Sequence, residues 1–384
     1  MLRELTKREI RNFLQHPIYI VCMVLLPLFV TVFFTTLMDD GQPVNMPIGV
    51  VDLDNTSTTR KLTRMVDALQ STEVVGHYPS VDEARAAIQR NEIYGFVLFP
   101  RNLTSKMISG RQPRMSFYYT NTSLTAGALV YKEMKTMCSL ASAGVGQAMM
   151  RAKGFTSEQM RAFLMPVSID LHTIGNPWVS YNIFLCSMLL PGMMLLFILL
   201  ITVYAVGTEL KFGTSKEWLA TAGNNIVIAL IGKMLPYTVI FFSVFSAIMF
   251  YIFGILDFPA PGGYGRILLI SVLSVLSAQG FAVFVFGVMP SLRLAMSVCS
   301  LWAVLSFSMV GSAFPVFAMD APLQSLAWLF PLRHFYMIYQ LCIFNTYPLS
   351  DVSMHIGIMI IFTLLPLLTI KRIRKAMTTY EYQA

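Results

Sequence analysis

The sequence predicts an α-helical membrane protein with six transmembrane helices and a large extracytoplasmic α/β domain between the first and the second. The 384 residues are 55% hydrophobic and only 12% charged, and the charges are unevenly distributed. Six windows contain no Asp, Glu, Lys or Arg, and each can hold the roughly 20 residues that a spanning helix needs. These windows are 12–38, 171–208, 234–256, 267–292, 294–319 and 352–370.

The basic residues predict the orientation of these six spans. Six spans place both termini on one side, which then carries twelve Lys and Arg and five Asp and Glu, a net +7 of the overall +8. Of the Lys and Arg residues, the short loops of the other side carry only Arg266 and Arg333. The positive-inside rule makes the termini cytoplasmic. The basic balance therefore reflects orientation and anionic lipid, and gives no reason to expect nucleic acid as a partner.

Charge, periodicity and proline divide the chain into segments. An amphipathic basic helix precedes Pro17, with an apolar stripe at Leu2, Leu5, Glu9/Ile10 and Phe13/Leu14. Two windows near the C-terminus are broken by proline, and we interpret them as outer amphipathic or re-entrant helices. The expected segments are a cytoplasmic helix 1–16, spans 17–38, 179–206, 226–256, 266–289, 293–315 and 352–370, an extracytoplasmic domain 39–170, a cytoplasmic loop 207–225, outer helices 320–350 and a cytoplasmic tail 371–384.

Residues 39–170 have the pattern of a soluble α/β domain. Met46–Asp52 and the apolar run Ile93–Phe99 are strand candidates, and Met115, Phe117 and Tyr119 alternate as a third. A helix should follow the first strand, with Leu62, Met65, Val66 and Leu69 on one face, and a second should open at Ser80. A long helix over about 123–153 and a short one from Thr156 complete the domain. The strand–helix–strand order indicates a compact domain with its own core.

The loop 207–225 contains a short predicted helix. Thr214 and Glu217 fit the S/T-x-x-E capping box, so the helix should begin near Ser215. Gly223, followed by Asn224, favours its end. Only about two turns fit between these signals.

Two functions suit this short helix. Trp218 and Leu219 give it apolar side chains, and Phe212 lies just before it. A small helix with exposed aromatic side chains at a membrane surface could contact a soluble partner. The alternative is an interfacial helix that only anchors the loop among lipid headgroups, where Trp is also common.

Several chemistries are missing from the sequence. It has no Gly-x-x-x-x-Gly-Lys-Ser/Thr, His-Glu-x-x-His, Gly-x-Ser-x-Gly or Cys-x-x-Cys motif, and its five His are scattered. We therefore expect no catalytic residue, no metal site and no cofactor in this chain. The spans lack the ionisable residues that ion-coupled transporters use, so a transporter of this kind needs an energised partner.

The chain resembles a permease subunit of the ABC-2 type (the type V exporter, with an ABCG-like fold) over essentially its whole length. The resemblance depends on the order and spacing of several features. They are the basic N-terminal helix KREIRNFLQHP running into a Pro-containing first span, the large domain after that span, Glu209-x-x-x-Gly213-Thr214 with Leu219 following, Gly232-Lys233 opening the third span, and PLRHFYMIYQ before the last span.

The resemblance implies a partner and a location. In this family the loop after the second span is a coupling helix that inserts into a separate ATP-binding subunit, which holds ATP and Mg²⁺. The permease itself is not an enzyme, although the complex hydrolyses ATP. Further implied partners are a second permease chain (homo- or heterodimer), a periplasmic adaptor and membrane lipids, and the implied location is the bacterial inner membrane. The residues assigned to ATPase coupling are Glu209, Phe212, Gly213, Thr214, Glu217, Trp218 and Leu219.

The same resemblance implies alternating access, with substrate between the second and fifth spans of two permease chains. Met side chains adapt to varied shapes, so we expect export of an amphipathic or lipophilic substrate. For each candidate the alternative is that it faces lipid or packs between helices. A different function, a mechanotransmission module that acts on an envelope partner without transport, also suits the large domain. The candidate path residues are Met188, Met193, Met194, Phe197, Trp302, Phe307, Met309 and Phe314.

Overall fold

The computed structural model describes residues 2–109, 111–164, 172, 176 and 179–379. The chain forms two compact units, Met1–Asp39 with Ile174–Ala384 and Asp40–Thr173, which we call the membrane unit and the α/β unit. The last residues of the expected α/β domain, 165–170, and of the expected cytoplasmic tail, 380–384, lie outside the described residues.

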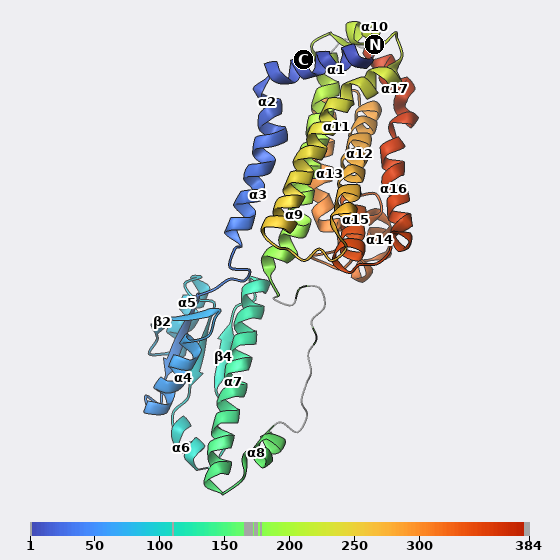
Figure 1. Ribbon diagram of the computed structural model, residues 1–384. Coiled ribbons are helices and arrows are strands. Elements are labelled where there is room, and N and C mark those ends of the chain that lie inside the picture. Colours follow the sequence, from blue (N-terminus) through green and yellow to red (C-terminus); the bar gives the residue numbers. More distant parts are fainter. Residues whose placement is uncertain (1, 110, 165–171, 173–175, 177–178, 380–384) are drawn as a thin grey trace. The chain divides into compact units, whose positions relative to one another are not determined.

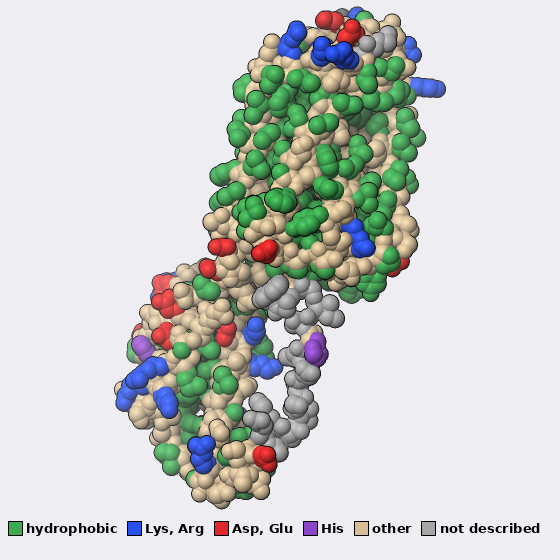
Figure 2. Space-filling view, in the orientation of Figure 1, with side chains coloured by type: hydrophobic (Ala, Val, Ile, Leu, Met, Phe, Trp, Pro, Cys, Tyr) green, Lys and Arg blue, Asp and Glu red, His purple; other side chains and the backbone are tan. Residues whose placement is uncertain are grey.

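The membrane unit contains the six predicted spans. Within the described part of the chain, six helices are long and apolar enough to cross a membrane (Figure 1). Figure 2 shows hydrophobic side chains over the visible side of this unit, with most of its visible Lys and Arg side chains at one end. The spans are Pro17–Leu37 (α2, a π-turn and α3), Tyr181–Lys211 (α9), Ile226–Ile255 (α11 and a π-turn), Tyr264–Val288 (α12), Leu292–Met309 (α13) and Leu349–Thr379 (a 3₁₀-turn, α16 and α17).

Three helix ends differ from the sequence-based expectation. Helix α9 continues to Lys211 instead of ending at residue 206, because its last turn is buried against neighbouring helices. Helix α13 ends at Met309 instead of residue 315, before Gly311, which has a φ of 94°. Helix α17 (Pro366–Thr379) continues the last span beyond residue 370, so most of the expected tail is helical.

The short helices lie at the two ends of the membrane unit (Figure 1). Helix α1 (Leu2–Gln15) and helix α10 (Ser215–Thr221) contact each other, and α10 also contacts α17. Helices α14 (Ala321–Ala327) and α15 (Pro331–Ile338) lie at the other end. Pro331, one of the prolines that break the two windows near the C-terminus, is the first residue of α15, where its missing N–H leaves no helical hydrogen bond unmade.

The α/β unit contains a four-stranded sheet with the order β2-β1-β3-β4. Strand β1 pairs in parallel with β2 and β3, and β3 pairs antiparallel with β4. The first, third and fourth strands match the expected runs, whereas β2 is an additional edge strand that the sequence did not predict, because TEVVGH has no apolar–polar alternation and only two apolar residues, the consecutive Val74 and Val75. The strands are β1 Met46–Asp52, β2 Thr72–His77, β3 Gly95–Phe99 and β4 Ser116–Tyr119.

Helices cover both faces of this sheet and create two small cores. One core joins the sheet to α4 and α7, with Val50, Val66 and Val130 fully buried. The other joins it to α5 through Val51, Ala84 and Phe96. Ser80 caps α5 as expected, because its hydroxyl accepts a hydrogen bond from the backbone N–H of Glu83. The helices are α4 Ser57–Asp67, α5 Val81–Gln89, α6 Leu103–Ile108, α7 Leu124–Ala152 and α8 Ser157–Leu164.

Candidate functional site

Helix α10 begins and ends where the sequence predicts, but its N-terminus is built differently. It starts at Ser215 and is followed by Gly223 and Asn224, both with positive φ. The expected capping box is absent, because Thr214 does not have the extended backbone of an N-cap and its side chain makes no capping bond. The Thr214 hydroxyl instead donates a hydrogen bond to the carboxylate of Glu209, 2.5 Å away. A hydrogen bond to an ionised acceptor is stronger than one between neutral groups, which explains the preference.

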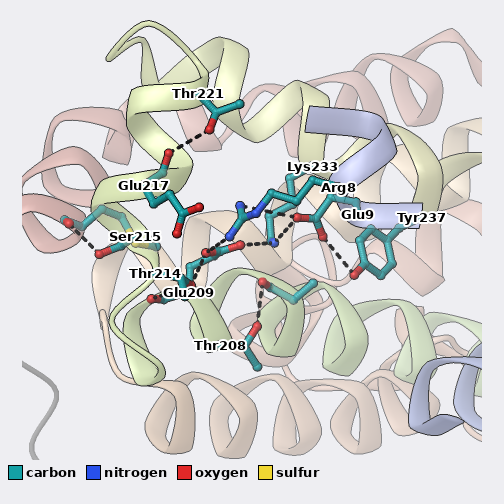
Figure 3. Close-up of polar contacts among 12 residues, drawn as sticks. Arg8, Glu9, Thr208, Glu209, Thr214, Ser215, Glu217, Thr221, Lys233 and Tyr237 are labelled. Atoms are coloured by element: carbon teal, nitrogen blue, oxygen red, sulfur yellow. Dashed lines mark hydrogen bonds and ion pairs between the residues drawn. The ribbon is translucent and has the colours of Figure 1, made fainter. Parts of the chain in front are cut away.

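Lys233 on α11 lies at the centre of a buried ionic cluster. Its side chain is completely buried, and its Nζ atom donates to Oε1 of Glu9 at 2.8 Å and to Oε1 of Glu209 at 2.7 Å (Figure 3). Arg8 Nη2 approaches Oε2 of the Glu209 carboxylate at 3.0 Å. Tyr237 donates its hydroxyl to Glu9 at 3.4 Å. Two cations therefore neutralise two carboxylates between α1, α9 and α11, and we call the cluster with Thr214 and Trp218 the α10 junction.

Trp218 connects α10 itself to this cluster. The Trp218 side chain is fully buried, and Lys233 Nζ lies 5.6 Å from the centre of its ring, a cation–π distance. On the same helix, the hydroxyl of Ser215 donates to the backbone carbonyl of Met377 on α17 at 2.8 Å. Helix α10 is thus held to α11 on one side and to α17 on the other, and its movement must be shared with them.

A close approach of α1 to α11 makes the junction possible. Gly232 packs against Leu5, and an added Cβ would lie 2.9 Å from carbons of that side chain. Leu5 and Glu9 are the two buried residues of α1, one turn apart on the face toward α11. The glycine therefore brings α1 near enough for Glu9 to reach Lys233.

The ion pairs of the junction fix the relative position of the helices more than they stabilise the fold. Removing ions from water costs several kcal/mol each, and their mutual attraction offsets this only when every partner is in place. Two carboxylates and two cations from three helices come within ion-pair distance of one another at one relative position of the helices. Sliding α1 along α11 by one turn would leave Glu9 buried without its cation.

The predicted ATPase-coupling residues divide between two faces of the α10 region. Glu209, Trp218 and Leu219 are buried, so the expectation of an exposed Trp218 was wrong: the ring covers the Lys233 cation. Thr214 is half-buried on Glu209. Phe212, Gly213 and Glu217 are exposed, and Phe212 is 67% exposed.

The candidate substrate-path residues do not share one chamber. Met188 and Met194 are buried, and the Met188 sulfur accepts a hydrogen bond from Ser312. Trp302 stacks on Phe330 at 4.7 Å between ring centres. The remaining positions differ in exposure: Met193, Phe197, Phe307 and Met309 are half-buried, Phe307 lies against Gly192, and Phe314 is exposed.

One candidate, Phe197, lines a groove on the membrane unit. The groove has a volume of about 570 Å³ and lies between the first span, α9 and α13. Its lining also includes two basic residues, Lys211 at the end of α9 and Arg293 at the start of α13.

A histidine pair near α15 was missed because its members are 21 residues apart in sequence. His334 is fully buried, and its Nε2 lies 2.9 Å from the carbonyl oxygen of Trp328. A carbonyl only accepts, so Nε2 carries the proton and Nδ1 of His334 accepts from Nδ1 of His355, 2.9 Å away. Burial lowers the pKa of His334 to about 4. In the described part of the chain no third His, Cys, Asp or Glu joins them, so they form no metal-binding group of three.

Comparisons with known proteins agree with this architecture. The family model described as ABC-2 family transporter protein matches residues 17–370. The probable multidrug ABC transporter permease YbhR of Escherichia coli strain K12 is 22% identical over 335 residues, which are 86% of each chain. YbhR of E. coli O157:H7 gives the same values. The matched residues include all six spans almost completely. The chain therefore belongs to the ABC-2 family of ABC transporter permeases.

Proposed function

We propose that this chain is the membrane-spanning subunit of an exporter that moves an amphipathic or lipophilic substrate out of the cytoplasm or the inner leaflet. A separate ATP-binding subunit, which holds ATP and Mg²⁺, would supply the energy. The family and the description of YbhR as a probable multidrug permease support this class of substrate. The complex would contain two permease chains and would lie in the bacterial inner membrane.

The observation that carries the proposal is the division of α10 into two faces. Its buried face is bonded to the transmembrane helices through Trp218 and Ser215. Its other face leaves Glu217 exposed, and Phe212, which precedes the helix in the chain, is an exposed aromatic side chain. Aromatic side chains are enriched in protein interfaces, and the rims of such interfaces are polar. We infer that the ATPase docks on this face.

The junction would transmit the ATPase movement to the spans. Because Lys233 bonds Glu209 of α9 and Glu9 of α1, a displacement of α10 moves three helices together. Helix α9 packs along α13, so this displacement reaches the second and fifth spans. Closure of the ATPase pair would then drive alternating access between them.

The same proposal orients the molecule. Helices α1, α10 and α17 lie together, and their basic residues would face the cytoplasm. The α/β unit would be extracytoplasmic, where a periplasmic adaptor could bind it.

Docking is tested by changing only the exposed face. We expect the double substitution F212A/E217K to weaken binding of the ATPase subunit at least about tenfold in detergent or nanodiscs, since exposed aromatic anchors dominate such interfaces. Substrate-stimulated ATP hydrolysis should fall in parallel. The control is F317A, which removes an 85% exposed phenylalanine at the α15 end. Unchanged ATPase affinity in F212A/E217K would disprove docking on this face.

A further inference from the structure

The groove beside Phe197 has the two parts of a site for an amphiphile. Its walls come from the first span, α9 and α13, and they are formed by Ile18, Cys22, Phe197, Leu200, Ile201 and Met296, among others. Its volume of about 570 Å³ falls in the range of about 300 to 1,000 Å³ that is usual for ligand pockets. The walls alone suit a hydrocarbon chain and would not distinguish one lipophilic molecule from another.

The charged residues of the groove would distinguish amphiphiles by the charge of their polar group. Lys211 and Arg293 both line it and both are exposed. The residues recorded along the groove include no Asp or Glu. Lys211 lies 5.6 Å from the centre of the Phe212 ring, and no carboxylate is recorded within ion-pair distance of Lys211 or Arg293 in the described chain.

Two other cations at this end of the membrane unit, Lys233 and Arg8, are already engaged. Lys233 is buried between two carboxylates, and Arg8 is bonded to one of them. Lys211 and Arg293 therefore differ from these residues in offering unmatched positive charge beside an apolar cavity. A guanidinium group also binds carboxylate or phosphate oxygens in a bidentate manner.

We propose that the groove binds an anionic amphiphile taken from the leaflet on the α10 side, with its hydrocarbon part along Phe197 and its carboxylate or phosphate between Lys211 and Arg293. This inference rests on the proposed export function and names its substrate class. The groove adjoins α9 and α13, the helices that the α10 junction would move. A displacement of α10 would therefore change the walls around the bound amphiphile. A cationic amphiphile of the same shape is disfavoured by both basic side chains.

The test is photo-crosslinking of the intact permease–ATPase complex in nanodiscs of zwitterionic lipid, without nucleotide. The probes are a long-chain fatty acid with a diazirine in its tail and the primary amine with the same tail. We expect the acid to label peptides of the first span and α9, and the amine to label them several-fold less. R293Q should lower labelling by the acid about threefold to fivefold, and K211Q/R293Q about tenfold or more. R372Q, which removes an exposed arginine of α17 outside the groove, should leave labelling unchanged.

Cys22 gives a second readout that does not use the two basic residues. All five cysteines are free, and Cys22 is half-buried in the groove wall, whereas Cys186, Cys299 and Cys342 are buried. In a C138A background, the fatty acid should slow the reaction of Cys22 with N-ethylmaleimide several-fold, and the matched amine should not.

The outcomes separate this inference from the proposed function. Equal labelling by acid and amine, or labelling that R293Q and K211Q/R293Q do not lower, would overturn it. If Cys22 is unreactive in the complex and neither probe labels the groove peptides, another protein surface covers the groove. This outcome also overturns the inference. Because nucleotide is absent, selective and Arg293-dependent labelling supports the inference even if the complex proves unable to export.

Discussion

The Nζ atom of Lys233 lies 2.8 Å from Oε1 of Glu9, although the two residues are 224 positions apart in sequence and both side chains are almost completely buried. The pair fixes α1 against α11 beside the start of α10. Removing only one of the two side chains should destabilise the protein, because the other would be left as a buried and unpaired charge.

The first prediction is that K233M destabilises the membrane unit by about 3–5 kcal/mol, the usual result of breaking a buried ion pair. Glu209 retains Arg8 and Thr214, so Glu9 is the carboxylate that loses its main cation. The double substitution K233M/E9Q should therefore recover much of the lost stability. Thermal unfolding of the purified protein in detergent measures both. The control is K371M, at an exposed position of α17, and equal losses in K233M and K371M would contradict the prediction.

The second prediction concerns the glycine beneath α1. G232A places a Cβ within 2.9 Å of the Leu5 side chain, so α1 must move away from α11. We expect a loss of about 1–3 kcal/mol, the usual cost of overpacking, measured by thermal unfolding. The control is G357A in α16, where an added Cβ meets nothing within 4 Å and the helix should gain slightly. A G232A protein as stable as G357A would show that the approach of α1 is loose.

The third prediction is a pH dependence set by His334. Burial lowers its pKa from 6.5 to about 4, so between these pH values the unfolded chain binds a proton that the folded chain excludes. The free energy of unfolding is therefore highest above about pH 6.5 and falls as the pH drops toward 4, by on the order of 3 kcal/mol. Protonation of Nδ1 would also set two N–H groups against each other, since His355 already donates there. The charged or titratable neighbours are Arg333 and His355.

The substitution H334Q separates this effect from general acid sensitivity. A glutamine amide can still donate to the Trp328 carbonyl but does not titrate, so the fall in melting temperature between pH 7 and pH 5 should shrink. The control is H77Q, at an exposed histidine of the α/β unit, which should keep the wild-type pH dependence. An H334Q profile that matches wild type would exclude His334 as the source.

These cases show what sequence patterns predict and what they miss. Periodicity and charge predicted the spans, the first strand and the start of α10, because each depends on residues close together in the chain. Glu9 gave a signal, since a carboxylate occupied the apolar stripe of its helix, but nothing in the sequence identified Lys233 as its partner. That pairing depends on how two helices approach, and Gly232 decides this only in three dimensions.

Trp218 and Thr214 illustrate the same limit. The sequence pattern favoured an exposed tryptophan and a capping threonine, which are sound local choices for an isolated helix. Both side chains instead contact charged groups of the junction. The Trp218 ring packs against the Lys233 ammonium, and the Thr214 hydroxyl donates a hydrogen bond to the Glu209 carboxylate. The buried cluster therefore overrides local capping preference, and the sequence predicted the position of α10 more accurately than the surroundings of its side chains.

The last prediction tests the orientation on which the proposed function depends. Lys375 on α17 and Val75 on β2 are both exposed, and Val75 is 52% exposed, so a cysteine at either position should react with maleimide. If the basic end of the membrane unit is cytoplasmic, a membrane-impermeant maleimide should label V75C in intact spheroplasts and K375C only after permeabilisation. The parent chain, with its native cysteines, gives the background. Labelling of K375C in intact spheroplasts would place α17 and α10 on the outer side, where no ATP-binding subunit could reach them, and the proposed coupling through Lys233 would fail with it.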